Sequence, residues 1–119
     1  MSEGVKGIRE TKRINEFARE VHQIAVDHGW WKDEPSFPEV IALCHAELSE
    51  ALEEYRKGKK PNEVYYKDCS PRGIPIELAD VILWILDYCG HAGIDIEKCL
   101  EEKNNFNRSR SYRHGGKVI

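Results

Sequence analysis

Apolar residues recur every three or four positions along most of this chain, which is the periodicity of helices that bury one face. The pattern predicts four helices, at about residues 8–28, 37–57, 75–90 and 96–108. No stretch alternates apolar and polar residues in the way a half-buried strand does. Helices joined by short or moderate loops are typical of an all-α fold, and we predict a four-helix bundle.

Several helix ends carry residues that suit caps. Ser36 is a candidate N-cap, and Glu39 three residues later completes a capping box. Asp95 is the candidate N-cap of the fourth helix. The inward face of that helix is expected to contain Ile96, Cys99, Leu100 and Phe106. Residues 58–73 form a connector, in which we expect no more than a short helical turn at residues 62–66.

The third predicted helix is apolar almost all the way round, which is typical of a buried central helix. It is expected to end near Gly90, before a loop at residues 91–93. Six consecutive apolar residues occupy every direction around it: Val81, Ile82, Leu83, Trp84, Ile85 and Leu86. A thin bundle of one chain cannot easily cover them, so the pattern predicts a homodimer or a homotetramer.

Two acidic pairs interrupt these apolar faces. Glu77 and Asp80 lie three residues apart, and therefore on one face of the third helix; Glu47 and Glu50 have the same spacing in the second. Carboxylates beside a buried face are costly unless a proton, a basic partner or a metal ion compensates them. Two such helices can face each other and form one four-carboxylate site. An all-oxygen ligand set favours Mg²⁺, with Mn²⁺ as a possible substitute.

Other interpretations of the acids stay open. Each pair by itself is also compatible with the polar rim of an amphipathic helix. Di-iron bundles typically carry a Glu-x-x-His pair on two helices, whereas here the third residue after each leading acid is Glu or Asp. A non-catalytic helical interaction or regulatory module is the remaining alternative.

The composition is that of one soluble domain of 119 residues with a net charge of −3. The four cysteines have no CxxC spacing, and no apolar run approaches membrane-spanning length, so we expect a cytoplasmic protein with no membrane partner. Residues 103–119 contain no Asp or Glu but five cations: Lys103, Arg108, Arg110, Arg113 and Lys117. A basic tail beside an acidic centre suggests phosphate binding rather than affinity for a nucleic acid polymer.

The two acidic pairs are separated by 26 residues. Glu47-x-x-Glu50 and Glu77-x-x-Asp80 at this separation resemble the ExxE…ExxD signature of the MazG-like all-α nucleoside triphosphate pyrophosphohydrolases. The tail also resembles the end of many MazG-like domains, because Lys103 is followed one helical turn later by Asn107 and then by an Arg-His-Gly run at residues 113–115. The resemblance covers about residues 14–117.

This resemblance implies a single MazG-like domain over residues 1–119, with Mg²⁺ bound by Glu47, Glu50, Glu77 and Asp80. It implies hydrolysis of a (deoxy)nucleoside triphosphate at the α-phosphorus, which gives the monophosphate and pyrophosphate, in house-cleaning or nucleotide-pool control. Lys103 and Asn107 would contact the phosphates or the sugar, and we choose Glu50 as the general base. The further candidates for substrate contact are Arg110, Arg113 and His114 over the triphosphate, and the aromatic residues Trp31 and Trp84 beside the base. We expect one residue of the pair Trp30-Trp31 to pack in the core.

Overall fold

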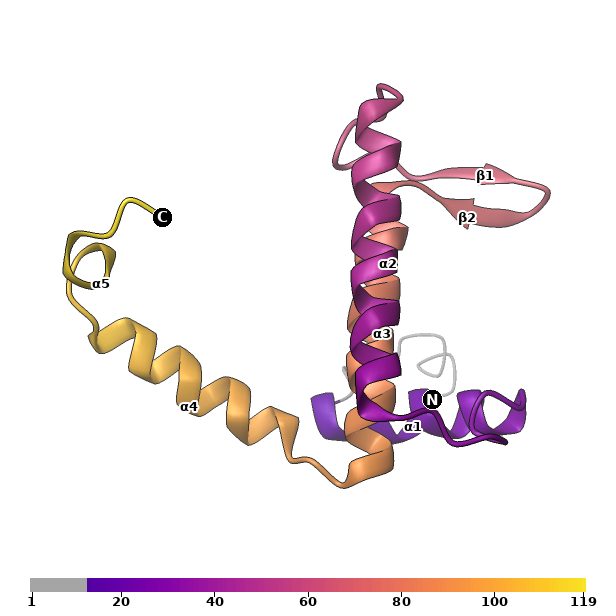
Figure 1. Cartoon of the computed structure of the whole chain (residues 1–119), viewed down its shortest axis with the longest axis horizontal. Coiled ribbons are helices and arrows are strands. Elements are labelled where there is room, and N and C mark those ends of the chain that lie inside the picture. The colour runs from indigo at the N-terminus through magenta and orange to yellow at the C-terminus, as the bar shows by residue number, and fades with distance from the viewer. Residues whose placement is uncertain (1–12) are drawn as a thin grey trace, which may run out of the picture.

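The computed structural model of the protein describes residues 13–119 and is mainly helical (Figure 1). Its helices are α1 (Ile14–Asp27), α2 (Phe37–Arg56), α3 (Ile74–Ala92), α4 (Ile96–Ser109) and a short α5 (Arg113–Gly116). Two short strands, β1 (Tyr65–Lys67) and β2 (Ser70–Arg72), form an antiparallel hairpin between α2 and α3. The mainly helical class agrees with the sequence-based prediction. The beginning of the first predicted helix, residues 8–12, lies outside the described residues.

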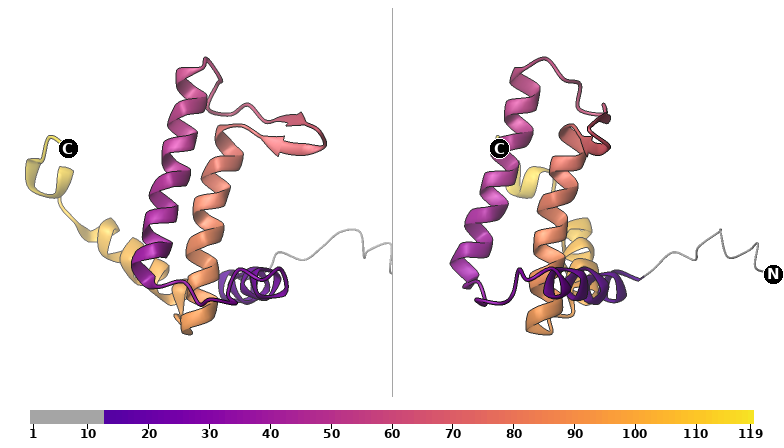
Figure 2. Two further views of the ribbon diagram at one scale, coloured as in Figure 1. Left: turned by 45° about the vertical axis from the view of Figure 1, so that its right-hand side comes forward. Right: turned by 90° about the vertical axis from the view of Figure 1, so that its right-hand side faces the viewer.

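The centre of the molecule is the antiparallel pair formed by α2 and α3, which lie side by side in Figures 1 and 2. The predicted capping box at the start of α2 is confirmed, since Ser36 Oγ accepts from the Glu39 N–H at 3.3 Å and the Glu39 carboxylate accepts from the Ser36 N–H at 2.8 Å. The buried apolar side chains of the pair are Val40, Cys44, Ala51, Ile74, Leu86 and Cys89. Several of them are small, which lets the two helices approach closely.

Helix α1 crosses α3 near its end, where small residues meet. A Cβ atom added at Gly90 would lie 2.7 Å from the carbonyl oxygen of Ala18, so only glycine permits this approach. The prediction that α3 ends near Gly90 was wrong, because the helix continues through His91 to Ala92. It ends at Gly93, whose φ of 68° gives the left-handed C-cap that glycine adopts without strain.

The connector contains a β-hairpin, so the predictions of a helical turn at residues 62–66 and of no strand were wrong. Tyr65 pairs with Arg72, and the turn at Asp68 and Cys69 has positive φ at both residues, as a type I′ hairpin turn requires. Strands of three residues are too short to show an alternating pattern. The Tyr65 hydroxyl donates to the Glu54 carboxylate at 2.7 Å and fastens the hairpin to α2.

Helix α4 leads away from the α2–α3 pair instead of packing beside it (Figures 1 and 2). The predicted N-cap is confirmed, since the Asp95 carboxylate accepts from the Lys98 N–H at 3.0 Å. Asn15 joins this end to α1, donating to Asp95 at 2.7 Å and accepting from the Glu97 N–H at 3.1 Å. Beyond this joint α4 has no buried residue.

The face of α4 that was expected to point inward is therefore largely exposed in one chain. Leu100 is 49% and Phe106 55% exposed, and the radius of gyration is 17.6 Å, where a compact domain of this size has about 13 Å. Within residues 13–119, one chain forms three packed helices and a projecting fourth. The single chain does not form a four-helix bundle within these residues, since α4 is joined to α1 through Asn15 and then leads away from α2 and α3.

Candidate metal centre

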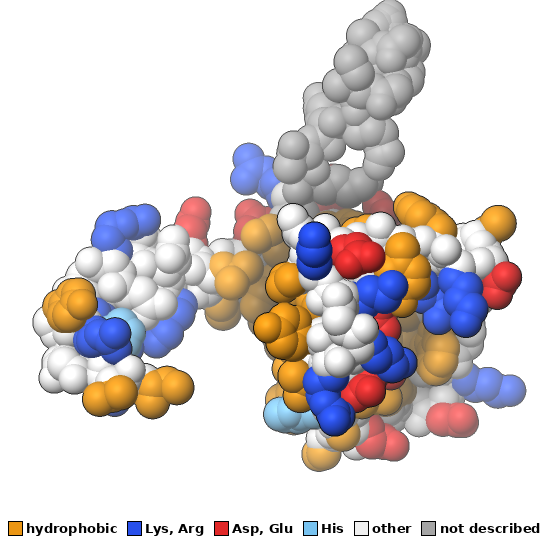
Figure 3. Space-filling model, turned by 90° about the horizontal axis from the view of Figure 1, so that it is seen from above, with side chains coloured by type: hydrophobic (Ala, Val, Ile, Leu, Met, Phe, Trp, Pro, Cys, Tyr) orange, Lys and Arg blue, Asp and Glu red, His pale blue; other side chains and the backbone are white. Residues whose placement is uncertain are grey.

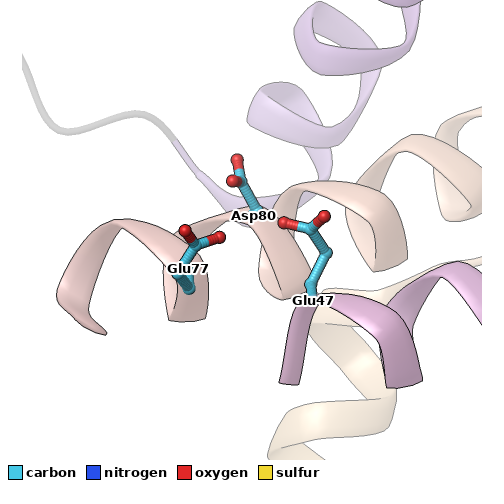
Figure 4. A group of neighbouring side chains, drawn as sticks. All are labelled: Glu47, Glu77 and Asp80. Carbon is cyan, nitrogen blue, oxygen red and sulfur yellow. The ribbon is translucent and has the colours of Figure 1, made fainter. Parts of the chain in front are cut away.

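Three of the four predicted acids converge between α2 and α3. Glu47 reaches from α2 toward Glu77 and Asp80 on α3 (Figure 4), and one carboxylate oxygen of each lies within 4.8 Å of the others. The three-residue spacing keeps Glu77 and Asp80 on one face of α3, and the antiparallel pairing of the helices sets Glu47 opposite them. All three side chains are half-buried.

Burial and mutual repulsion disfavour the charged forms of these acids. The pKa of Glu47 is raised to about 7, first by burial, then by a hydrogen bond with Asp80 and by the charges of Glu50, Asp80 and Glu77. The pKa of Glu77 is raised by burial and by the charges of Glu50 and Asp80. Among residues 13–119, no Lys or Arg forms an ion pair with Glu47, Glu77 or Asp80. Burial and the neighbouring acids therefore favour the protonated form of Glu47.

Glu50 stands at the edge of this cluster. Its side chain is exposed, and it does not belong to the group of three closely spaced ligand atoms. Its charge nevertheless raises the pKa values of both Glu47 and Glu77, so it lies close enough to act on them. An exposed carboxylate at this edge is accessible to water and could accept a proton from it.

Glu54 is a neighbouring acid that the sequence-based set of ligands leaves out. It follows Glu47 by seven residues and therefore lies on the same face of α2. Its charge contributes to the raised pKa of Glu77, and its carboxylate is held by the Tyr65 hydroxyl. The seven-residue spacing from Glu47 is the signal in the sequence that could have identified Glu54. The hydrogen bond from the Tyr65 hydroxyl could not be predicted, because the sequence did not predict the strands.

The donor set fits a hard divalent cation. It consists of carboxylate oxygens alone, which suits Mg²⁺, Mn²⁺ or Ca²⁺ better than zinc or copper. Burial and the neighbouring carboxylates raise the pKa values of Glu47 and Glu77, and a divalent cation would offset this repulsion. Within the described chain no histidine joins the cluster, which disfavours the Glu-x-x-His arrangement of di-iron bundles.

Two cavities border Asp80 and share Trp30 and Trp84 as walls. The first has a volume of about 360 Å³ and lies between α1 and α3. The second, of about 520 Å³, is lined by acidic residues, namely Asp33, Glu39, Glu47 and Asp80. The Trp30 and Trp84 rings meet edge to face, with centroids 6.3 Å apart. The group of Glu47, Glu77 and Asp80 is thus flanked by aromatic surface.

The two adjacent tryptophans have different positions. Trp31, the predicted base contact, donates its indole N–H to the Asp87 carboxylate at 2.9 and 3.1 Å and stacks on His91 with centroids 4.2 Å apart. Trp31 lines neither of the two cavities beside Asp80, whereas Trp30, which is 63% exposed, lines both. The sequence pattern shows only that one of the pair packs inside, because neighbouring residues at a helix exit have no fixed periodicity.

The predicted phosphate contacts lie apart from the acids of their own chain. Lys103 and Asn107 line a separate cavity of about 500 Å³ along α4. Arg110 lies over the Phe106 ring, and Arg113 donates to the carbonyl oxygens of Lys117 and Val118. Arg113 and His114 are exposed. Figure 3 shows this basic segment separated from the body of the molecule, so one chain does not bring it to the acids.

Comparisons of the chain with protein-family models, with curated proteins and with solved structures give no match. Among residues 13–119, no helix combines the length and the apolarity needed to cross a membrane.

The raised pKa of Glu47 predicts how stability depends on pH without metal. Because the folded state holds the proton more tightly than the unfolded chain, stability is highest below about pH 4.5 for this group and falls as the pH rises toward about 7. We expect the melting temperature of chelator-treated protein to decrease across this window, and Glu47→Gln to make the decrease smaller, with the remainder due to Glu77. Millimolar Mg²⁺ or Mn²⁺ at about pH 8 should raise the melting temperature again.

The matched control is Glu101→Gln on α4, outside the cluster, which should leave the pH profile unchanged. A melting temperature that rises with pH through this window, or a Glu47→Gln profile identical to the parent profile, would contradict the electrostatic account of the cluster.

Proposed function

We propose that the protein is a Mg²⁺-dependent nucleoside triphosphate pyrophosphohydrolase of the MazG-like type, which releases pyrophosphate and a nucleoside monophosphate. The observation that carries the proposal is the group of Glu47, Glu77 and Asp80, which lacks a basic partner among residues 13–119 and borders a cavity walled by Trp30 and Trp84. The sequence resemblance at Glu47-x-x-Glu50 and Glu77-x-x-Asp80 adds the reaction class.

The acids divide into two roles in this proposal. Glu47, Glu77 and Asp80 would hold the cation, which supplies neutralisation of the phosphate oxygens and a lower pKa of bound water. Glu50, exposed at the edge of the cluster, would accept the proton of the attacking water. Trp84 and Trp30 would contact the base, since both line the cavities next to Asp80.

A second copy of the chain completes the site in this proposal. Large apolar side chains remain exposed on α2, α3 and α4: Ile41, Leu48, Leu52, Tyr55, Leu78, Ile82, Ile85, Leu100 and Phe106. Covering them in a homodimer or a homotetramer would complete a MazG-like bundle. The same association would bring the basic tail of one chain, with Lys103, Asn107, Arg110, Arg113 and His114, to the acids of another.

A cytoplasmic location and a part in nucleotide house-cleaning or pool control go with this proposal, because the substrates are found there. The exposed apolar faces of α2, α3 and α4 also favour a second candidate function, that of a helical interaction module without catalysis. A hydrolysis assay distinguishes the two functions, since an interaction module would not release pyrophosphate.

The reaction itself is tested by incubating the full chain with each common NTP and dNTP in Mg²⁺ and measuring pyrophosphate and orthophosphate separately. We expect pyrophosphate and the monophosphate. Glu77→Ala and Asp80→Ala should abolish the activity while leaving the helical fold intact or more stable without metal, because each removes one of several repelling carboxylates. Glu53→Ala is the control and should keep full activity, because Glu53 is exposed on α2 and lines neither cavity beside Asp80.

Release of orthophosphate and a nucleoside diphosphate would refute the proposed bond cleavage. Loss of the fold in metal-free Glu77→Ala would show that this acid is a structural partner of a base rather than a metal ligand.

The shared site is tested by complementation between two inactive variants. Asp80→Ala removes an acid, and Lys103→Ala removes the predicted phosphate contact of the tail. If each site combines the acids of one chain with the tail of another, a mixed dimer has one site with both substitutions and one intact site. Co-expression in equal amounts should then restore about a quarter of the parent activity.

If the tail served the acids of its own chain, no combination would contain an intact site and the mixture would stay inactive. A monomer by light scattering at micromolar concentration would also refute the shared site.

A further inference from the structure

The cavity between α1 and α3 has the dimensions and the lining of a site for one aromatic ring. Its volume of about 360 Å³ lies in the range of small-molecule pockets. Apolar side chains from both helices line it, namely Val21, Ile24, Ala25 and Leu83. Trp30 and Trp84 add aromatic surface on the wall shared with the acid-lined second cavity. Asp80 borders both cavities, so a ring bound here would lie next to the three acids of the proposed cation site.

The polar residue farther along this cavity is Asp87. It follows Asp80 by seven residues on α3, so the two lie on one face and roughly 10 Å apart along the helix axis. Asp87 is 4% exposed. Its Oδ1 atom accepts from the Trp31 indole at 2.9 Å and from the His22 ring at 2.8 Å, while Oδ2 takes only the longer 3.1 Å contact from Trp31. Oδ2 therefore keeps capacity to accept a further hydrogen bond.

His28 adds a second acceptor to the lining. Its Nδ1 atom lies 2.8 Å from the carbonyl oxygen of Ile24, which can only accept, so Nδ1 carries the hydrogen. In the neutral ring Nε2 is then an acceptor. The donors among the lining side chains are the indole N–H groups of Trp30 and Trp84, which belong to the wall near Asp80. The cavity thus offers hydrogen-bond donors near Asp80 and a hydrogen-bond acceptor at Asp87.

We propose that this cavity selects nucleobases that carry an exocyclic amino group, cytosine and adenine, over their oxo counterparts, uracil and hypoxanthine. The inference rests on the proposed function and names the substrate class of the same site. With its phosphates at the cations beside Asp80, a nucleotide directs the far edge of its base toward Asp87. An amino group there donates to the carboxylate, whereas an oxo group sets one acceptor against another and leaves both without a donor.

The test uses pairs of substrates that differ at this single exocyclic group, CTP against UTP and ATP against ITP. We expect kcat/KM for pyrophosphate release to be about tenfold or more higher for the amino member of each pair, the size of one hydrogen bond to a charged group. Binding of CMP and UMP in Mg²⁺, followed by tryptophan fluorescence, should show the same preference independently of hydrolysis, because a monophosphate has no pyrophosphate to release.

The informative variant is Asp87→Asn, which keeps one oxygen for Trp31 and His22 and replaces the other with an NH₂ donor. The preference should fall to about one or invert. Asp27→Asn, the same change at the end of α1 and outside both cavities, should leave the preference unchanged. If Asp87→Asn does not fold, Ala25→Leu fills the cavity instead and should weaken CMP binding without changing Mn²⁺ affinity.

The outcomes separate this inference from the proposed function. Hydrolysis of all four triphosphates at similar rates, or a preference for UTP and ITP, overturns the cavity assignment and leaves the pyrophosphohydrolase intact. No hydrolysis together with tighter binding of CMP than UMP overturns the proposed reaction and supports the cavity as a base site. An unchanged CMP affinity in Ala25→Leu overturns the assignment of this cavity.

Discussion

The arrangement of this protein depends on one electrostatic constraint: three carboxyl groups, with one oxygen of each within 4.8 Å of the others, are held between two packed helices. Packing of Val40, Cys44 and Ala51 against α3 brings the helices together, and the same packing forces Glu47 toward Glu77 and Asp80. Carboxylates in such a place are tolerated only with a proton or a cation between them. The pKa of Glu47 is raised to about 7 because, without a cation, a proton on this side chain reduces the repulsion. A divalent cation meets it better at neutral pH, because it compensates all of the acids at once.

The surroundings of the cluster differ on its two sides. Toward α1 lies an apolar cavity with aromatic walls and the buried Asp87, which is fixed by Trp31 and His22. Toward the outside lie Glu50 and Glu54, of which the second is held by the hairpin. A nucleotide matches these two sides, since its base is aromatic and its phosphates bind cations. The basic tail matches the phosphates as well, yet in one chain α4 carries it away from the acids, which is why a second copy enters the proposed function.

Much of the fold and of the centre follows from local chemistry in the sequence. The capping residues Ser36 and Asp95 and the three-residue spacing of the acids depend on contacts within one or two turns, so they were predictable. The hairpin was not, because strands of three residues give no alternation and the Asp68–Cys69 turn lacks the usual glycine. Nor could the sequence distinguish Trp30 from Trp31, since their roles depend on where Asp87 and His91 lie across the loop. The course of α4 depends on Asn15, which is 80 residues away from Asp95. Long-range contacts of this kind leave no periodic signal.

The central claim is that the acids between α2 and α3 form a cation site, and calorimetric titration with Mn²⁺ tests it most directly. Titrations in two buffers of different ionisation enthalpy give the number of protons released on binding. The account predicts that Mn²⁺ binds, that binding at about pH 6 releases close to one proton because Glu47 is then mostly protonated, and that the release declines by about pH 8. Glu47→Gln should bind Mn²⁺ more weakly and release fewer protons. No heat of binding to the parent protein, or the same proton release in Glu47→Gln, would contradict the account.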